Sequence, residues 1–207
     1  MALKSLYKKF FALAYDVFMF PLEKLGLKKL RGKVLKFIKG ETILELGVGT
    51  GLNAFAYPDG IKIIGVERKL EMIKRAIKRT QKLKKNVAII CANVEMLPFG
   101  DEKFDTVFAT FVFCEVKNPE KGFAEIIRVL KPGGRLVLLE HVRPDGKSLS
   151  KIFDFGNKFT SILGENINRT TAETVLKAGF KIERIEKISD GIVKLIIGTK
   201  PDKIHRI

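Results

Sequence analysis

Tryptophan is absent from this chain, and cysteine, histidine and glutamine are rare, with two, two and one copies in 207 residues. Two cysteines cannot build the disulfide framework of a small secreted scaffold. Cys91 lies in an apolar stretch, where we expect a buried thiol. Because the histidines and cysteines show no metal-ligand spacing, the sequence predicts no metal site.

A long uncharged apolar run is also missing. The most apolar stretch, residues 10–20, has eleven residues and contains Asp16, so it is too short for a helix that spans a membrane. No secretory signal is evident, and we therefore expect a reducing, cytoplasmic setting. The abundance of Lys, Glu and Ile is a compositional hint of a thermophilic source.

Positive charge is abundant and unevenly placed in the chain, whose formal net charge is +16. Residues 1–40 hold ten basic and two acidic residues, and residues 68–85 hold nine and one. The rest of the chain balances at twenty of each sign. Such basic segments favour contact with an anionic membrane or a nucleic acid, although a solvated basic face is the simpler interpretation.

The first segment is amphipathic, with apolar side chains at helical spacing from Leu3 to Phe18 and lysines on the other side. Pro21 predicts an interruption before a second basic amphipathic stretch at 22–38. We expect residues 1–40 to form a helical cap whose apolar face packs over a ligand pocket. Contact of residues 1–38 with an anionic membrane surface or an acyl chain is a compatible second interpretation.

Glycine gathers in residues 42–51, TILELGVGTG, where an apolar run leads into Gly47, Gly49 and Gly51. This pattern predicts a buried strand that enters a tight turn. A second apolar run follows and ends in Glu67. A glycine turn after one strand and an acid at the end of the next is typical of nucleoside binding in a doubly wound sheet, with the carboxylate on the ribose diol. A turn that binds nothing is the alternative.

The spacing of the glycines argues against a dinucleotide, because Leu52 stands where the third glycine of that motif belongs. Glu45 would add negative charge to a phosphate site, and it suits a ligand with an ammonium group. S-adenosylmethionine combines an ammonium group, a sulfonium group and an adenosine without a phosphate, and it therefore fits both observations.

Five segments in matching order resemble the class I S-adenosylmethionine-dependent methyltransferases, over about residues 41–142. They are ELGVGTG at 45–51, VERKLEMI at 66–73, NVEMLPF at 93–99, FDTVFA at 104–109 and RVLKPGGRL at 128–136. The resemblance implies that S-adenosylmethionine is the cofactor and S-adenosylhomocysteine the product. The implied cofactor-binding residues are Glu45, Gly47, Gly49, Thr50 and Gly51 in the turn, Glu67, Arg68 and Met72 at the ribose and adenine, and Asn93, Val94 and Glu95 after the third strand. Asn93 stands where the family usually has Asp, and its amide can still hydrogen-bond an adenine edge.

Shorter strings at 111–114, 139–143 and 166–171 are similar to a subgroup with membrane-associated alkyl-thiol methyltransferases and small phosphatidylethanolamine N-methyltransferase-like proteins. The quinone-biosynthesis methyltransferases look more distant. This likeness suggests a class of acceptor rather than one compound.

Strand and helix patterns alternate from residue 42 onward, which predicts an α/β fold with a doubly wound, Rossmann-like sheet. Asp190-Gly191 separates the last two alternating runs and predicts a hairpin. The resemblance adds a seven-stranded, mostly parallel sheet with this hairpin antiparallel at the C-terminus. We expect one structural unit, with a cap at 1–40 and a cofactor-binding domain at 41–207. The predicted strands are 42–47, 62–67, 86–92, 104–110, 134–142, 181–187 and 192–199, and the predicted helices are 51–56, 69–84, 119–130 and 171–178.

Few side chains are candidates for chemistry beyond the cofactor motifs. His141, at the predicted end of a strand, is the candidate general base, although a histidine that only orients a neighbour fits equally well. Cys114 has no cation beside it in the sequence, so we expect it to line the pocket. Phe111 is a predicted cofactor-binding residue, and Tyr15 is predicted to reach the methionine end of the cofactor, although Tyr15 could instead be a core aromatic. Asp154 and Asn168 are candidate polar groups of the pocket.

Three functions remain open on the sequence alone. The first is methyl transfer to a small apolar or lipid-like acceptor through an N, S, O or C nucleophile. The second is methylation of RNA through the basic surface. Against it, the chain lacks the Asn-Pro-Pro-aromatic string of base-amino methylation, and no proline precedes Cys114. The third is a non-catalytic, cofactor-binding protein of the membrane surface.

Overall fold

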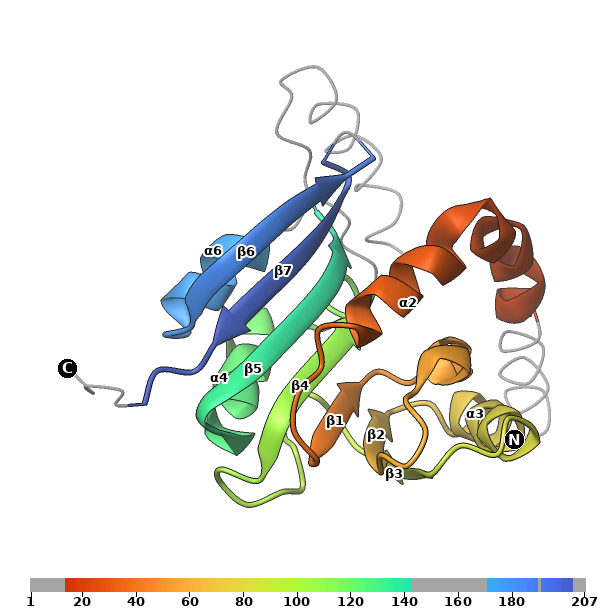
Figure 1. Ribbon diagram of the computed structural model, residues 1–207, viewed down its shortest axis with the longest axis horizontal. Helices are drawn as coiled ribbons and strands as arrows, with labels where there is room; N and C mark the ends of the chain where they lie inside the picture. Colours follow the sequence, from red (N-terminus) through yellow and green to blue (C-terminus); the bar gives the residue numbers. More distant parts are fainter. Residues whose placement is uncertain (1–13, 143–170, 190, 203–207) are drawn as a thin grey trace.

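The computed structural model describes residues 14–142, 171–189 and 191–202, and it shows one seven-stranded sheet in the order β3-β2-β1-β4-β5-β7-β6 (Figure 1). The strands from β3 across to β5 pair in parallel, and β7 pairs antiparallel with both β5 and β6. This confirms the predicted doubly wound sheet with its antiparallel end. The strands are β1 (Ile43–Leu46), β2 (Ile63–Glu67), β3 (Val87–Cys91), β4 (Phe104–Thr110), β5 (Leu130–His141), β6 (Lys181–Ile188) and β7 (Val193–Thr199).

Strand β1 lies at the centre of the sheet, and all four of its side chains are buried. Neighbouring strands cover both of its edges, with Ile43 in register with Ile63 of β2 and Thr106 of β4. Alternation along the strand sends Leu44 and Leu46 to one core and Ile43 to another. A continuous apolar run of this kind is typical of a parallel strand covered on both faces. Glu45 is the exception, and it belongs to the site described below.

Helices cover both faces of this sheet. The 3-10 turn η2 (Leu52–Ala56) contacts both α2 (Lys28–Leu35) and α3 (Leu70–Lys82), so the three elements form one layer. The other layer contains α4 (Pro119–Val129) and α6 (Thr171–Lys177), which contact each other beside the antiparallel end of the sheet (Figure 1). Among the residues described, no helix is both long and apolar enough to cross a membrane.

The N-terminal region departs from the sequence prediction in two ways. Residues 14–22, here called the cap helix, continue through Pro21, and the chain bends later, in the π-helical turn η1 (Glu23–Leu27). There Gly26 adopts a φ of 140°, which a residue with a side chain rarely reaches. Proline costs a helix one hydrogen bond but keeps a helical φ, so the glycine rather than the proline redirects the chain. Phe18, predicted on the packed face, is 70% exposed because Met19 turns inward instead.

Cys91 is exposed rather than buried. It ends β3, an edge strand whose outer side has no neighbour in the sheet. The described chain has no helix between β3 and β4. An apolar sequence therefore did not ensure burial here, because the covering element is absent.

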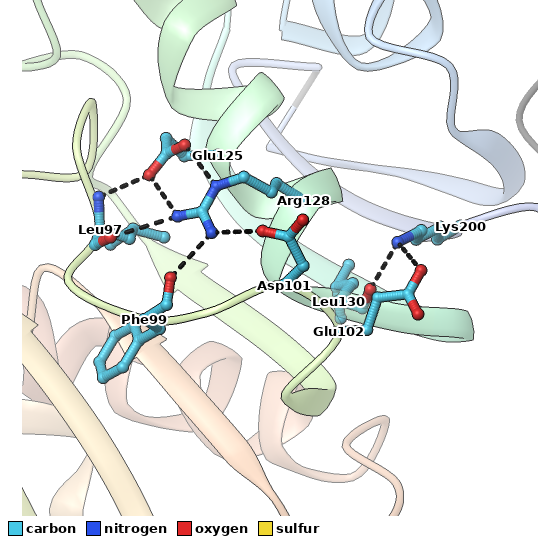
Figure 2. A network of polar contacts seen from close by, with 8 residues as sticks. All are labelled: Leu97, Phe99, Asp101, Glu102, Glu125, Arg128, Leu130 and Lys200. Atoms are coloured by element: carbon cyan, nitrogen blue, oxygen red, sulfur yellow. Dashed lines mark hydrogen bonds and ion pairs between the residues drawn. The ribbon is translucent and has the colours of Figure 1, made fainter. Parts of the chain in front are cut away.

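A polar network fixes the long connection between β3 and β4 (Figure 2). Arg128 of α4 donates to the backbone carbonyls of Leu97 and Phe99 and pairs with Asp101 and Glu125. Nearby, Lys200 Nζ donates to the carbonyl of Leu130 at 2.7 Å and to Glu102. Hydrogen bonds to charged groups are the stronger kind, so this network can order a connection without a helix. The residues that it orders, 97–102, follow Asn93, which the sequence predicts to bind the cofactor.

Candidate active site

A cleft of about 850 Å³, including its open mouth, lies at the carboxyl ends of β1, β2 and β4. This is the edge of an open α/β sheet where ligands bind. Most of the residues predicted to contact the cofactor line this cleft. They are Tyr15, Gly47, Gly49, Thr50, Glu67, Arg68, Met72, Asn93, Val94, Glu95 and Phe111. Gly51 is outside the lining and closes the turn behind Thr50, and Glu45 lies elsewhere, as described below.

The glycine turn allows the backbone to form the floor of the cleft. Gly47 has a φ of 61°, and a Cβ atom there would lie 2.5 Å from a methyl carbon of Val112. Gly51 has a φ of 81° and packs against Ala76 of α3, so a side chain would push that helix away. Gly49 has a φ of 58° and little beyond its own turn around it, so its backbone faces open space. A ligand can therefore approach the main chain closely.

Glu67 ends β2 and is already held in place by backbone donors. Its Oε2 accepts a hydrogen bond from Gly49 N at 3.0 Å, and its Oε1 accepts from the amides of Arg68 and Lys69 at 2.8 Å. A carboxylate offers about four lone-pair sites, so these bonds leave Oε2 able to accept another donor. This arrangement fits a ribose hydroxyl and orders the carboxylate before the ligand arrives.

The next cleft residues, Asn93 to Glu95, follow β3. Asn93 Oδ1 accepts from the backbone amide of Glu95 at 3.2 Å, which orients the amide group. Glu95 Oε1 accepts from the amides of Lys117 and Asn118, just before α4. The carboxylate of Glu95 therefore organises the wall of the cleft, and Val94, which is buried, supplies its apolar part. Met72 rises from α3 and adds a second apolar surface, as an adenine ring requires.

Glu45 is placed differently from the prediction. Its side chain is fully buried behind the glycine turn and is not part of the cleft lining. It accepts hydrogen bonds from the hydroxyl of Tyr57 and from Asn53 Nδ2, the latter at 2.7 Å. Burial raises the pKa of Glu45 to about 7, against the effect of these two donors. Direct contact with a ligand ammonium group does not follow from this geometry, and the residue acts as a buried support for the turn.

The cap helix contributes Tyr15 to the cleft, and the next residue, Asp16, attaches the helix to the rest of the domain. Tyr15 lines the cleft, and burial raises its pKa. Asp16 accepts from Thr50 Oγ1 at 2.6 Å, from Arg75 Nε at 2.9 Å and from Arg79 Nη2 at 3.1 Å. The carboxylate thus joins the cap helix to the glycine turn and to α3. This cluster of Asp16, Thr50, Arg75 and Arg79, here called the cap latch, was not predicted, because a single acid on an amphipathic helix carries no distinctive pattern.

Phe111 follows β4 and adopts a φ of 58°, which is rare for a bulky residue and is often found at functional sites. Its amide donates to the carbonyl of Leu139 at 2.8 Å. The carboxylate of Glu140, fully buried, accepts from the next two amides, at Val112 and Phe113. Glu140 therefore fixes the strained segment that forms one wall of the cleft, and this residue too was missed in the sequence.

His141 does not line the cleft itself. Its ring stacks on Phe111, which does, with 4.5 Å between the ring centroids. Burial, together with the charge of Arg31, lowers the pKa of His141 from its ordinary value, so the ring is neutral at pH 7. Its role as a general base stays a prediction. Cys114 is buried outside the cleft lining, contrary to expectation, and Asp154 and Asn168 lie outside the described residues.

Arg31 of α2 is the main cleft residue that the sequence did not suggest. It lies in a basic stretch of the chain where it resembles its neighbours, yet it alone among the described lysines and arginines of that stretch is buried. Within the described residues, no group of three or more His, Cys, Asp or Glu side chains is arranged to hold a metal ion.

Comparison with known proteins identifies a matching family and several relatives of this chain. Residues 44–138 match a family model described as a methyltransferase domain. The ubiquinone/menaquinone biosynthesis C-methyltransferase UbiE of Francisella tularensis subsp. novicida is 32% identical, over 78% of this chain and 75% of its own length. A phosphatidylethanolamine N-methyltransferase of Cereibacter sphaeroides is also 32% identical, over 67% of this chain and 71% of its own. At equal identity, the quinone-biosynthesis enzymes are not more distant, contrary to the sequence expectation.

Among solved structures, a SAM-dependent methyltransferase of Thermotoga maritima, described as a possible histamine N-methyltransferase, superposes with a TM-score of 0.72. It is 25% identical, and the match covers 93% of this chain and 97% of that one. The strand order, the glycine turn and the acid at the end of β2 all fit the family that these matches indicate, and the matches cover most of this chain. The chain belongs to the class I S-adenosylmethionine-dependent methyltransferases.

Proposed function

We propose that this protein binds S-adenosylmethionine in the cleft and transfers its methyl group to a small apolar or lipid-like acceptor. The proposal rests mainly on how polar and apolar residues are distributed in the cleft. Polar groups that fit an adenosine, Glu67 and Asn93, lie at the ends of β2 and β3, whereas Phe111 and Val112 follow β4. The bound cofactor supplies a methyl group that the sulfonium charge activates. The protein then has to align the acceptor and exclude water.

The acceptor class rests on the apolar side of the cleft and on the relatives. Phe111, Val112 and Val116 give this side of the cleft an apolar surface, next to the charged side chains of Arg31 and Glu115. The names of two relatives refer to ubiquinone and menaquinone biosynthesis and to phosphatidylethanolamine, and all of these compounds are lipids. If the acceptor atom arrives protonated, neutral His141 is the group beside Phe111 that could take the proton.

We also propose that the exposed surface of the cap contacts a membrane. Val17, Phe18, Phe20 and Leu25 are between 59% and 84% exposed. Lys24 is exposed among them, and its Nζ lies 4.5 Å from the centre of the Phe20 ring. Exposed aromatic and aliphatic side chains beside lysines suit the surface of an anionic bilayer. Tyr15, which lines the cleft, lies only two residues before Val17, so this surface would hold the cleft close to its lipid-like acceptors.

The basic charge of residues 68–85 does not require RNA as a partner. Arg75 and Arg79 are used in the cap latch, Lys69 pairs with Glu115, and Lys74 pairs with Glu71. These pairs account for much of the charge run that suggested nucleic-acid binding.

A methyl-transfer assay with labelled S-adenosylmethionine tests the proposal. The acceptor panel contains a demethylated quinol, phosphatidylethanolamine vesicles, an alkyl thiol and bulk RNA, and the Glu67→Ala variant is the control. Label in one of the three organic acceptors, lost in the variant, would support the proposal. Label in RNA alone would favour the second function, and cofactor binding without transfer to any acceptor would favour a non-catalytic protein.

A further inference from the structure

An ion pair between Lys69 and Glu115 lies at the mouth of the cleft. Lys69 Nζ is 2.7 Å from Glu115 Oε2, and both residues line the cleft. Their side chains are 36% and 38% exposed, whereas Val66, which also lines the cleft, is fully buried. The contact between the two charges therefore lies at the outer end of the cleft, above its buried part.

The two partners come from opposite walls of the cleft. Lys69 lies between β2 and α3, two residues after Glu67, and Glu115 lies in the connection from β4 to α4. Strand β1 runs between β2 and β4, so two strand spacings, about 10 Å, separate the ends of these strands. The long side chains of a lysine and a glutamate cover this distance. Their contact joins the two walls above the glycine turn that follows β1.

The backbone at each end of the pair is held in place. The amide of Lys69 donates to Glu67 Oε1 at 2.8 Å. The amide of Glu115 donates to the carbonyl of Val112 at 3.0 Å, and the amide of Val112 in turn donates to the buried carboxylate of Glu140. Exposed side chains change rotamer within nanoseconds, whereas loops move more slowly. The cleft can therefore open at this point by movement of two side chains, without movement of its walls.

From these observations we infer that the Lys69–Glu115 pair is a gate for the cofactor. It closes the cleft over the adenosine, and it opens each time S-adenosylmethionine enters or S-adenosylhomocysteine leaves. The inference rests on the proposed function, because it takes this cofactor as the ligand of the cleft. A gate that is closed equally in the free and the bound protein slows association and dissociation by the same factor, so it leaves the dissociation constant unchanged.

The rates of ligand exchange test this inference, and surface plasmon resonance with S-adenosylhomocysteine as the probe measures both of them. This probe has no net charge, so long-range attraction to the protein contributes little to its association rate. In Glu115→Ala and in Lys69→Ala we expect both rates to rise by about three- to fivefold, the range expected for an exposed ion pair, with an unchanged dissociation constant. The double variant should match the single variants, because either substitution removes the pair.

Salt provides a second measurement, which needs no variant. Because the pair is half-exposed, added salt should screen it and raise both rates of the wild type. The rates of the double variant should not respond to salt. Salt-independent rates of the wild type would overturn the inference.

The matched control is Lys74→Ala. Lys74 is 62% exposed in α3 and pairs with Glu71 of the same helix at 2.8 Å, outside the cleft lining, so this variant should keep the wild-type rates. Unchanged rates in Glu115→Ala would overturn the inference and leave the proposed function intact. A weaker affinity with an unchanged association rate would also overturn it, because Glu115 would then contact the ligand directly. Absence of binding by the folded wild type would instead overturn the proposed function, and the gate with it.

Discussion

Single residues in the site have roles that depend on very local geometry, and Gly47 is the clearest case. We expect Gly47→Ala to abolish cofactor binding and to lower the free energy of unfolding by about 2 kcal/mol or more. The added Cβ meets a left-handed φ of 61° and a Val112 methyl carbon at 2.5 Å. Urea unfolding and calorimetric titration measure the two effects.

Gly60 provides the control for Gly47. It has a φ of 80°, but a Cβ atom there would meet nothing within 4 Å. Gly60→Ala therefore reports the backbone strain alone. It should lower the free energy of unfolding by less than Gly47→Ala does, and it should leave cofactor binding intact. The double variant Gly47→Ala, Val112→Ala should recover part of the stability. Equal losses for the two glycine variants would show that contact with Val112 is unimportant.

Glu45 should make stability depend on pH. Burial raises its pKa from an ordinary value near 4.5 to about 7, so the folded state holds a proton that the unfolded state releases between these pH values. Its contribution is complete below pH 4.5 and is lost as the pH rises through about 7. We expect the free energy of unfolding of the wild type to fall by about 3 kcal/mol relative to Glu45→Gln between pH 4.5 and 8.

Urea unfolding of both proteins at several pH values gives this difference, because the other titrating groups are common to both and cancel. In the Glu45→Gln variant the side-chain oxygen can still accept from Asn53, and the Tyr57 hydroxyl can rotate its proton away and accept from the new amide group. A difference that stays constant over the whole range would mean that Glu45 is ionised in the fold throughout.

At the scale of elements, the cap latch determines how the cap helix is held on the domain. We expect Asp16→Asn to weaken this attachment by about 1–3 kcal/mol, because one half-buried carboxylate serves Thr50, Arg75 and Arg79 together. Hydrogen exchange of the amides at 14–22 should accelerate, while exchange in β1 and β4 stays unchanged.

Asp59→Asn is the matched control, since Asp59 is 94% exposed and pairs with a single lysine. That variant should leave exchange in the cap helix at the wild-type rate. Unchanged exchange in Asp16→Asn as well would mean that apolar contacts such as that of Met19, rather than the latch, hold the cap helix.

The elements themselves could largely be predicted from the sequence, whereas several site contacts could not. The apolar run before Gly47 predicts β1 correctly, because a central parallel strand is buried on both faces. Cys91 looks equally apolar in sequence, but it is exposed, because exposure depends on whether another element covers β3. Arg31 meets Thr110 across 79 positions of the chain, a contact that no local pattern encodes.

At the scale of the whole molecule, charge and apolar surface coincide on the cap. We expect the wild type to sediment with vesicles that contain anionic lipid, and more weakly with neutral vesicles or at high salt. The double variant Phe18→Ser, Leu25→Ser should bind about tenfold more weakly, since two exposed apolar side chains no longer enter the bilayer. Leu176→Ser, at a similarly exposed leucine of α6, should bind as the wild type does. Sedimentation that the double variant does not change would place the membrane contact elsewhere.

In the proposed complex, the cleft holds S-adenosylmethionine with its ribose on Glu67. Calorimetric titration of the wild type and of Glu67→Ala with this cofactor measures whether this carboxylate binds the ligand. We expect saturable binding by the wild type and a loss of about tenfold or more in the variant, because the carboxylate both accepts from the ribose and holds the backbone of Gly49. Absence of binding by the folded wild-type protein, or equal affinity in the variant, would contradict it.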